Sequence, residues 1–424
     1  MIKKPHIVII GGGFAGCAAA KICAKADVNV TLLDKRNHHV FQPLLYQVAT
    51  ATLSPAQISY PIRMMFRKQK NVTVLLGNVE HVDVKKKQLS LKRSKRIIEF
   101  DYLIVAGGAR HSYFGKPEWE KYAWGLKTNR DALKIRERLL YSLEKAERTT
   151  SEKKQRRFST FVIVGGGPTG VEMAGAIAEM TQKTVVNDFK RFDTRQAKVI
   201  LIEGADKLLA RYPKNLSDQA FIDLSKMGVD IRLNKMVKDV TKKGVQVDDA
   251  FIETENIIWA AGNAASPVLE SVTQDRHPMG MANVNLDFSI KEDPNVFCVG
   301  DCAYLVDATG KLVPGVAQGA MQGGAFVGRQ ILRDLKGQDR QEFCYFDKGK
   351  MATIGHSKAV ADIWGVQFSG FFAWILWSFI HVLFLIDFRS RFGVFMDWIW
   401  SYFTHNRSVR LIIQYREKTT DDLG

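Results

Sequence analysis

The same glycine-rich turn occurs twice in this chain, each time after an apolar run and before a helix-forming run. The first copy lies within residues 6–34 and contains the loop Gly11-Gly-Gly-Phe-Ala-Gly16, and a second apolar run ends at Asp34. In a dinucleotide-binding βαβ unit, the glycines make a tight turn, admit a pyrophosphate and pack helix on strand, while the acid binds ribose hydroxyls. The spacing therefore predicts a nucleotide site at Gly11, Gly13, Gly16 and Asp34. A turn that is only structural is the alternative.

Residues 159–203 repeat this pattern, with the loop Gly165-Gly-Gly-Pro-Thr-Gly170 and an acid, Glu203, after the closing strand. The gap between loop and acid is longer than the usual crossover, so the helix must run on or carry an insertion through residues 181–195. No arginine directly follows Glu203 to receive a 2′-phosphate, which favours NADH over NADPH. Two dinucleotide sites imply two dinucleotides.

A third signal is an apolar strand, residues 295–299, that runs into Gly300-Asp301. It resembles the segment of two-dinucleotide flavoproteins whose aspartate binds the ribityl chain of FAD; a simple turn is the alternative. Two further apolar strands end in small residues at Gly107 and Gly262. We interpret them as the return crossings between two nucleotide domains, so that the FAD domain is discontinuous and the NADH domain is inserted into it.

Three more stretches narrow the resemblance to one family. Residues 317–322, Ala-Gln-Gly-Ala-Met-Gln, match AQxAxQ, the quinone motif of type II NADH dehydrogenases, at every fixed position. Residues 41–50 and 351–355 support the same family. The chain resembles these single-subunit NADH:quinone oxidoreductases nearly end to end.

The resemblance implies a fold, two cofactors and a reaction. We expect an α/β protein with two Rossmann-like domains and a C-terminal helical region that associates with a membrane. The expected boundaries are 1–113 and 263–335 for the FAD domain, 114–262 for the NADH domain and 336–424 for membrane anchoring and dimerisation. Non-covalently bound FAD would take a hydride from NADH and reduce a quinone of the respiratory chain without pumping protons. Menaquinone and ubiquinone both remain open, as do a ternary complex and a ping-pong order.

The two glutamines of the motif, Gln318 and Gln322, are spaced i and i+4 and so lie on one helix face. Gly319 and Ala320 between them keep the surface low enough for a flat ring to approach. An amide can donate to a quinone carbonyl or accept from a hydroquinone hydroxyl, and a neutral group suits a site near lipid. The alternative is a helix packed under the flavin with the glutamines bonded to backbone.

Glu172 comes two residues after the last glycine of the second loop, where we expect the first turn of a helix. There the helix dipole would stabilise its anion, and this could be its whole role. The family resemblance implies instead that Glu172 faces the flavin where the nicotinamide stacks. It could then orient NADH or help to move the protons that quinone reduction needs.

The predicted functional residues fall into three sets. The catalytic set is Glu172, Gln318 and Gln322. The FAD set is Gly11, Gly13, Phe14, Ala15, Gly16, Asp34, Lys35, Gln47, Gly107, Gly300, Asp301, Ala317 and Gln318. The NADH set is Gly165, Gly167, Gly170, Glu172, Glu203, Ala261 and Gly262. No metal site is expected.

The five cysteines separate this chain from related flavoproteins. A disulfide reductase needs a cysteine pair after the first helix, and residues 41–59 contain none. Sulfide:quinone oxidoreductases also use flavin-side cysteines, and Cys298 and Cys302 flank Gly300-Asp301. Cys298, however, lies within an apolar strand, where a free cysteine is commonly a small hydrophobe. Sulfide chemistry stays an alternative, as does a flavoprotein that binds NADH and a protein partner.

The C-terminal region contains residues 363–386 without Asp, Glu, Lys or Arg, and residues 371–386 are almost wholly apolar. As a helix this apolar core would span about 24 Å, less than the roughly 30 Å of a hydrocarbon layer. Trp398, Trp400 and Tyr402 are of the type that gathers at membrane interfaces. We predict two amphipathic helices that lie on the membrane and form a homodimer contact. A transmembrane hairpin and a buried core helix are the alternatives.

The net charge of +17 comes from 61 Lys and Arg against 44 Asp and Glu. Residues 61–96 contribute 11 basic residues against two acids, or +9, and residues 127–157 contribute 11 against five, or +6. No basic helix carries interleaved aromatics, so we do not expect nucleic acid as a partner. The absence of a targeting segment suggests a peripheral protein on the cytoplasmic face of the inner membrane.

Overall fold

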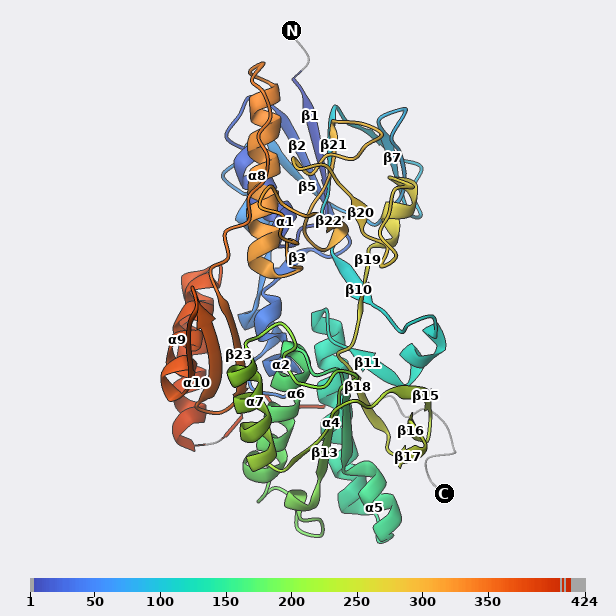
Figure 1. Ribbon diagram of the computed structural model, residues 1–424, viewed down its shortest axis with the longest axis vertical. Helices are drawn as coiled ribbons and strands as arrows, with labels where there is room; N and C mark the ends of the chain where they lie inside the picture. The colour runs from blue at the N-terminus through green and yellow to red at the C-terminus, as the bar shows by residue number, and fades with distance from the viewer. Residues whose placement is uncertain (1–3, 405, 408, 413–424) are drawn as a thin grey trace. The chain divides into compact units, whose positions relative to one another are not determined.

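The computed structural model describes residues 4–404, 406–407 and 409–412, and the chain divides into two compact units (Figure 1). The first unit consists of Met1–Val40, Ser59–Arg110 and Asn263–Lys348. The second unit consists of Phe41–Ile58, His111–Gly262 and Gly349–Gly424. Each unit contains a parallel five-stranded sheet. The predicted α/β class with two Rossmann-like sheets is confirmed.

The sheet of the first unit has the strand order β21-β9-β1-β2-β5, and every neighbouring pair is parallel. Its strands are β1 (His6–Ile10), β2 (Asn29–Asp34), β5 (Val72–Leu76), β9 (Tyr102–Val105) and β21 (Val296–Cys298). Alternate side chains of β1 enter two separate apolar clusters, Ile7 and Ile9 in one and Val8 and Ile10 in the other. Because both faces of the sheet are buried, the strand is apolar at every position after His6.

Two helices of the first unit, α1 (Phe14–Cys23) and α8 (Ala317–Asp334), pack side by side on this sheet (Figure 1). Their close approach depends on glycine. A Cβ atom on Gly324 would lie 2.1 Å from the Ala15 carbonyl oxygen, and one on Gly328 would lie 2.9 Å from the Ile22 Cβ. These contacts bring the N-terminal part of α8 close to the glycine loop that precedes α1.

Smaller elements complete the first unit. They are β3 (His38–Val40), β4 (Ser59–Pro61), α3 (Ile62–Met65), β6 (Val79–Asp83), β7 (Gln88–Leu91), β8 (Ile97–Glu99), β10 (Ala109–His111), β19 (Asn263–Ala265), β20 (Ala282–Asn283) and β22 (Ala303–Tyr304). Strands β6, β7 and β8 form an antiparallel sheet of their own.

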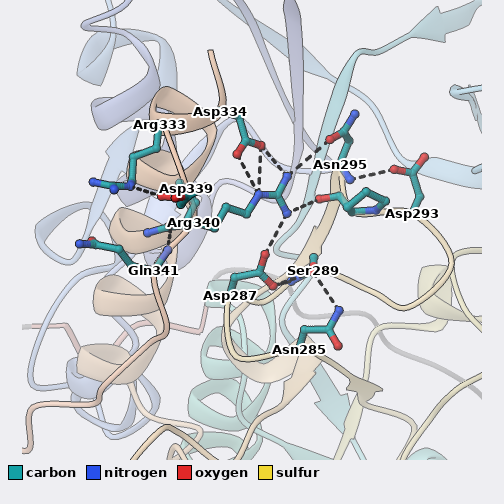
Figure 2. Close-up of polar contacts among 12 residues, drawn as sticks. Asn285, Asp287, Ser289, Asp293, Asn295, Arg333, Asp334, Asp339, Arg340 and Gln341 are labelled. Atoms are coloured by element: carbon teal, nitrogen blue, oxygen red, sulfur yellow. Dashed lines mark hydrogen bonds and ion pairs between the residues drawn. The ribbon is translucent and has the colours of Figure 1, made fainter. Parts of the chain in front are cut away.

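Arg340, just after α8, is the centre of a polar network in the first unit (Figure 2). Its guanidinium pairs with Asp287 at 2.8 Å and with Asp334, and it donates to the Pro294 carbonyl at 2.6 Å. It also lies over the ring of Phe297 in β21, 4.9 Å from the centroid. Arg340 therefore joins the end of α8 to the strand that leads into Gly300-Asp301.

The sheet of the second unit has the order β11-β18-β12-β13-β14, again with parallel neighbours. Its strands are β11 (Ala123–Gly125), β12 (Thr160–Val164), β13 (Lys198–Ile202), β14 (Val229–Arg232) and β18 (Asn256–Trp259). Its helices are α2 (Leu45–Ala49), α4 (Asn129–Arg148), α5 (Glu152–Phe158), α6 (Pro168–Glu179) and α7 (Lys214–Lys226). Strands β15 (Val237–Thr241), β16 (Gly244–Val247) and β17 (Ala250–Glu253) form an antiparallel sheet.

The long crossover predicted between the second glycine loop and Glu203 is present. Helix α6 is continued by one π-helical turn, Met180–Thr184, and the chain then runs irregularly to a short 3₁₀ turn at Thr194–Gln196. The added stretch therefore leaves the βαβ geometry of β12, α6 and β13 intact.

The predicted C-terminal helical region is also present. Strands β23 (Lys350–Gly355), β24 (Lys358–Ile363) and β25 (Val366–Gly370) form an antiparallel sheet, followed by α9 (Phe371–Phe384) and α10 (Phe388–Thr404). Figure 1 shows these two helices in red beside that sheet. They expose large apolar side chains, including Phe372, Phe388 and Phe403. In the described part of the chain, no helix has both the length and the apolar character that crossing a membrane requires.

We expect Arg340→Ala to lower the free energy of unfolding by about 3 kcal/mol, because it leaves Asp287 and Asp334 without their partner in a site that is mostly closed to water. The matched control is Arg195→Ala, whose pair with Asp193 is exposed and should contribute nothing measurable. Thermal unfolding of both variants checks this, and equal midpoints would contradict the role given to Arg340.

Candidate active site

The first glycine loop joins β1 to α1 and has the geometry of a pyrophosphate cradle. Gly11 adopts a φ of +104°, and a Cβ there would lie 2.2 Å from the Ala106 carbonyl oxygen. A Cβ on Gly16 would lie 1.8 Å from the Gly11 carbonyl oxygen. Gly13, by contrast, faces open space, and a Cβ there would have no such neighbour within 4 Å. The loop therefore excludes side chains where the backbone is tight and leaves Gly13 accessible to a ligand, as a dinucleotide requires.

The acid at the end of β2 supports this loop. Asp34 is buried, and its Oδ2 accepts the Gly12 N–H at 2.7 Å while its Oδ1 accepts the Arg36 N–H at 2.7 Å. His39 approaches from β3, with its Nδ1 3.1 Å from the Gly12 carbonyl oxygen. Burial lowers the pKa of His39, which favours the neutral ring, and its contact with Gly12 supports the loop structure. Lys35 is exposed next to Asp34.

The carboxyl ends of β9 and β21 bring further predicted FAD residues to the same loop. Gly300 has a φ of +67°, and a Cβ there would lie 3.3 Å from the Ala320 Cβ and 3.5 Å from the Ala15 Cβ. Asp301 follows directly, and Gly107 lies at the end of β9 beside Ser266. Ligands of open α/β sheets bind at this carboxyl edge. Gln47 is placed elsewhere, on α2 of the second unit.

The two motif glutamines both reach the segment that follows Cys344. Gln318 accepts the Lys348 N–H through its Oε1 at 3.2 Å. Gln322 accepts the Phe346 N–H at 3.0 Å and donates to the Phe346 carbonyl at 2.8 Å. The two side chains share one face of α8, as their spacing predicts. The Gln322 amide thus both donates to and accepts from the Phe346 backbone, as a residue of an adjacent β-strand would. Bonding to backbone, the alternative stated for these glutamines, is therefore part of the role of Gln322.

The second glycine loop repeats the first in the second unit. Gly165 has a φ of +108°, a Cβ on it would lie 2.8 Å from the Ala260 carbonyl carbon, and Gly167 faces open space. A Cβ on Gly170 would lie 1.8 Å from the Gly165 carbonyl oxygen. Glu203 accepts the N–H groups of Gly166 and, at 2.8 Å, of Ala205. Ala261 and Gly262 follow β18 beside this loop. The second loop and Glu203 therefore fit a dinucleotide, just as the first loop and Asp34 do.

The structure corrects the prediction for Glu172. Helix α6 begins at Pro168, so Glu172 lies in its second turn, not in the first turn where the dipole acts most strongly. Glu172 keeps part of its surface open to a cavity, yet enough protein surrounds the carboxyl that desolvation dominates. Burial raises its pKa well above the ordinary value, and a hydrogen bond from the Thr353 backbone opposes this. The environment therefore favours the neutral acid, whereas the sequence suggested a stabilised anion.

A glycine also explains how Thr353 comes so close to Glu172. Gly175 lies one turn after Glu172 on α6, and a Cβ there would lie 2.2 Å from the Ile354 carbonyl oxygen. Strand β23 can therefore rest directly on α6. The sequence contains no local signal of this contact, because the two segments are far apart along the chain.

The cavity beside Glu172 has a volume of about 60 Å³ and is entirely within the second unit. Its lining residues come from α2, α6, α9, α10 and the turn after β23; they include Tyr46, Gln47, Glu172, Glu179, His356, Trp377, Trp398 and Arg407. Arg407 is 5% exposed and pairs with Glu179 at 3.2 Å. It also donates to the carbonyls of Thr50 at 2.9 Å and Ala176 at 3.2 Å. The sequence analysis did not single out Tyr46, Thr353 or Arg407. It grouped Trp398 with membrane-interface aromatics, whereas the structure directs its N–H inward to Gln47.

The cysteines that kept sulfide chemistry open are buried and unpaired. Cys298 lies in β21 with no exposed surface, as predicted for a small hydrophobe, and Cys302 is equally buried. Burial raises the pKa of Cys302 to about 12 and that of Cys298 well above its ordinary value. A reactive cysteine needs a lowered pKa and access to solvent. These two thiols therefore lack the properties of redox or sulfide-handling groups.

Two family models match the chain. The model described as "Pyridine nucleotide-disulphide oxidoreductase" matches residues 5–324, and the "NDH2 C-terminal domain" matches residues 348–406. The type II NADH:quinone oxidoreductase Ndh of Mycobacterium tuberculosis is 41% identical over 419 residues, which is 96% of this chain and 89% of the relative. A mitochondrial internal alternative NAD(P)H-ubiquinone oxidoreductase of Arabidopsis thaliana is 28% identical, over 94% of this chain and 84% of the relative.

Solved structures agree on the fold. NDH2 of Plasmodium falciparum in complex with NADH superposes with a TM-score of 0.89 at 22% identity and covers 97% of this chain and 100% of that one. The sulfide:quinone oxidoreductase of Aquifex aeolicus gives a TM-score of 0.73 at 18% identity, over 97% and 96% of the two chains.

The raised pKa of Glu172 predicts a pH-dependent stability. Between its ordinary value of 4.5 and the raised native value, the folded state holds a proton that the unfolded state has lost, so stability falls as pH rises. Glu172→Gln keeps the size and cannot ionise. We expect its free energy of unfolding, measured by denaturant titration, to rise relative to that of the wild type as pH increases from 5 to 8, by up to about 1.4 kcal/mol per pH unit. A constant difference across this range would refute the raised pKa. Glu80→Gln, at an exposed position, is the surface control.

Proposed function

Because the chain belongs to the type II NADH:quinone oxidoreductase family, we propose that its first glycine loop holds FAD and its second holds NADH. The enzyme oxidises NADH and reduces a quinone with the help of its flavin. The observation that carries the function is the 41% identity to a named enzyme of this kind across 96% of the chain. Two complete dinucleotide cradles in one chain give that activity a physical basis.

FAD supplies the electron chemistry when bound, since a flavin can accept a hydride and pass on two electrons. The residues that would hold it are those of the first unit. The backbone of Gly11–Gly16 would receive the pyrophosphate, Asp34 the ribose, and Asp301 the ribityl chain, while Gly300 and Ala320 leave room for a flat ring. We assign the first unit to the FAD domain; the boundaries at 113 and 335 stay predictions.

NADH would bind along the carboxyl edge of the second sheet. Gly167 presents open backbone to the pyrophosphate, and Glu203 would accept ribose hydroxyls. A carboxylate at this position repels a 2′-phosphate, so NADH is the preferred donor over NADPH. Ala261 and Gly262 are small enough to let the dinucleotide pass the end of β18.

Glu172 is the proposed proton carrier. Quinone reduction consumes two protons, and a carboxyl whose raised pKa keeps it neutral has a proton to give. Gln318, in the first turn of α8, is the glutamine that would contact the quinone through its amide. Gln322 would shape that site by holding Phe346, since both its amide groups bond to that backbone. The acceptor is a membrane quinone of unspecified ring type.

The exposed apolar faces of α9 and α10 would place the enzyme on a lipid surface. Phe372, Phe388 and Phe403 are each more than three-quarters exposed, at 78, 80 and 77%. Aromatic side chains of this kind bury themselves at the boundary of headgroups and acyl chains. The enzyme would be peripheral, on the cytoplasmic face of the inner membrane, and the same helices would contribute to a homodimer.

The reaction can be tested by stopped-flow absorbance. NADH should bleach the flavin of the purified holoenzyme without oxygen, and a short-chain quinone should restore the oxidised spectrum within turnover time. Gly13→Val is the matched negative control, because it fills the open position of the first cradle and should lower FAD content. Reoxidation by oxygen alone, with quinone ignored, would overturn the proposed reaction.

Membrane attachment has its own test. The double variant Phe372→Asp/Phe388→Asp should reduce binding to phosphatidylcholine vesicles more than about tenfold, because it removes two aromatic side chains from the lipid-facing surface. Phe251→Asp, on β17, is the control at another exposed aromatic position. Light scattering without vesicles separates the outcomes. Unchanged vesicle binding together with a lost dimer would assign the face to the dimer contact instead.

A further inference from the structure

A series of hydrogen bonds links the C-terminal helix α10 to Thr353 of β23, the residue whose backbone acts on Glu172 of α6, inside the second unit. The Trp398 Nε1–H donates to Gln47 Oε1 at 2.7 Å, and Gln47 Nε2 donates to the Tyr46 hydroxyl at 3.0 Å. The Tyr46 hydroxyl lies 3.0 Å from the Thr353 Oγ1. Thr353 is also the residue whose backbone opposes the raised pKa of Glu172. We call the three hydrogen bonds from Trp398 to Thr353 the Trp398 series.

The donor-to-acceptor direction of the bonds in the Trp398 series follows from the chemistry of the Trp398 indole. An indole N–H can only donate, so the Gln47 carbonyl must face Trp398 and its NH₂ group must face Tyr46. The Tyr46 oxygen accepts that bond, which leaves its own proton free to point to Thr353. Trp398 therefore fixes which way an amide and a phenol are turned.

The middle of the series is shielded from water. Tyr46 and Gln47 are 7 and 8% exposed, and burial raises the pKa of Tyr46, so this phenol stays neutral and keeps its proton. Neutral dipoles in a low-dielectric site act strongly on a nearby charge. Tyr46 also interacts electrostatically with Glu172 directly, and both line the same cavity.

We infer that Trp398, Gln47 and Tyr46 are positioning residues that set the protonation state of Glu172 and thereby link α10 to the proton step. With the series intact, the Tyr46 hydroxyl donates to the Thr353 Oγ1, so its positive end faces the residue whose backbone acts on the acid, and this orientation favours the carboxylate. Without Trp398, the Gln47 amide can turn over and reverse the Tyr46 hydroxyl, so the acid holds its proton more tightly. The catalytic meaning of this link rests on the proposed proton role of Glu172.

Other groups near the acid must stay constant for this inference to be tested. The titratable and charged neighbours of Glu172 come from five segments packed around it: Tyr46 on α2, Glu179 on α6, Tyr212 before α7, His356 after β23 and Arg407 after α10. Arg407 and Glu179 pair with each other, so their charges compensate. A change confined to Trp398 replaces none of the five, and of these only the Tyr46 hydroxyl is expected to change its orientation.

The decisive variant is Trp398→Phe, which keeps an aromatic ring and removes only the N–H donor. Its control is Trp400→Phe, two residues away on α10, where the side chain is 60% exposed. The readout is the infrared band of the protonated Glu172 carboxyl in the holoenzyme, identified by its loss in Glu172→Gln and followed against pH. We expect Trp398→Phe to move the midpoint upward by about half a unit to one unit, and Trp400→Phe to leave it unchanged.

Tyr46→Phe is the second variant, since it breaks the series at another member and should move the midpoint in the same direction. Equal midpoints in wild type, Trp398→Phe and Tyr46→Phe would overturn the inference, and so would an equal shift in Trp400→Phe. The infrared readout does not depend on turnover. If the band shifts while Glu172→Gln leaves the pH profile of quinone-dependent reoxidation unchanged, the link exists and the proton role of Glu172 fails instead.

Discussion

The tight contact between the first and last glycines of each loop is the constraint on which both units depend. In either loop, a Cβ on the last glycine would lie 1.8 Å from the carbonyl oxygen of the first. The helix can therefore begin directly on the turn, with its N–H groups facing the carboxyl edge of the sheet. Both sheets share one arrangement around this point: the strand before the loop lies between the strand that carries the acid and the strand that returns to the edge.

The two units then diverge in what surrounds the same cradle. In the first unit small residues collect around it, since a Cβ added to Gly300 would lie 3.3 Å from the Ala320 Cβ and 3.5 Å from the Ala15 Cβ. In the second unit Gly175 allows a strand to rest on the helix, and the neighbouring turn carries an acid into a place where ionisation is unfavourable. The same backbone turn is thus surrounded by small residues in one unit and lies near an acid with a raised pKa in the other.

The parts of the fold that the sequence predicts are those with local patterns. Each of these parts is marked by a pattern contained within a few tens of residues. They are the glycine loops, their flanking strands, the long crossover after Gly170 and the apolar C-terminal helices. The environment of Glu172 could not be predicted, because its turn depends on where α6 begins and its raised pKa depends on burial by segments that are distant along the chain. Likewise, Gln47 and Trp398 are separated by 351 residues, and nothing near either one indicates the other.

The C-terminal region is bound into the second unit by its inward side chains, whereas its outward side chains remain apolar and exposed. Segments near a chain end commonly fray unless something holds them. Here Arg407 is compensated by Glu179 and two backbone carbonyls, and losing any of these partners would leave a buried charge unsatisfied. Trp398 adds a neutral hydrogen bond from within α10. The same helix therefore carries both exposed aromatic side chains and a hydrogen bond to Gln47 on α2. The tail is therefore part of the packing that shapes the cavity beside Glu172, since Trp398 and Arg407 both line it.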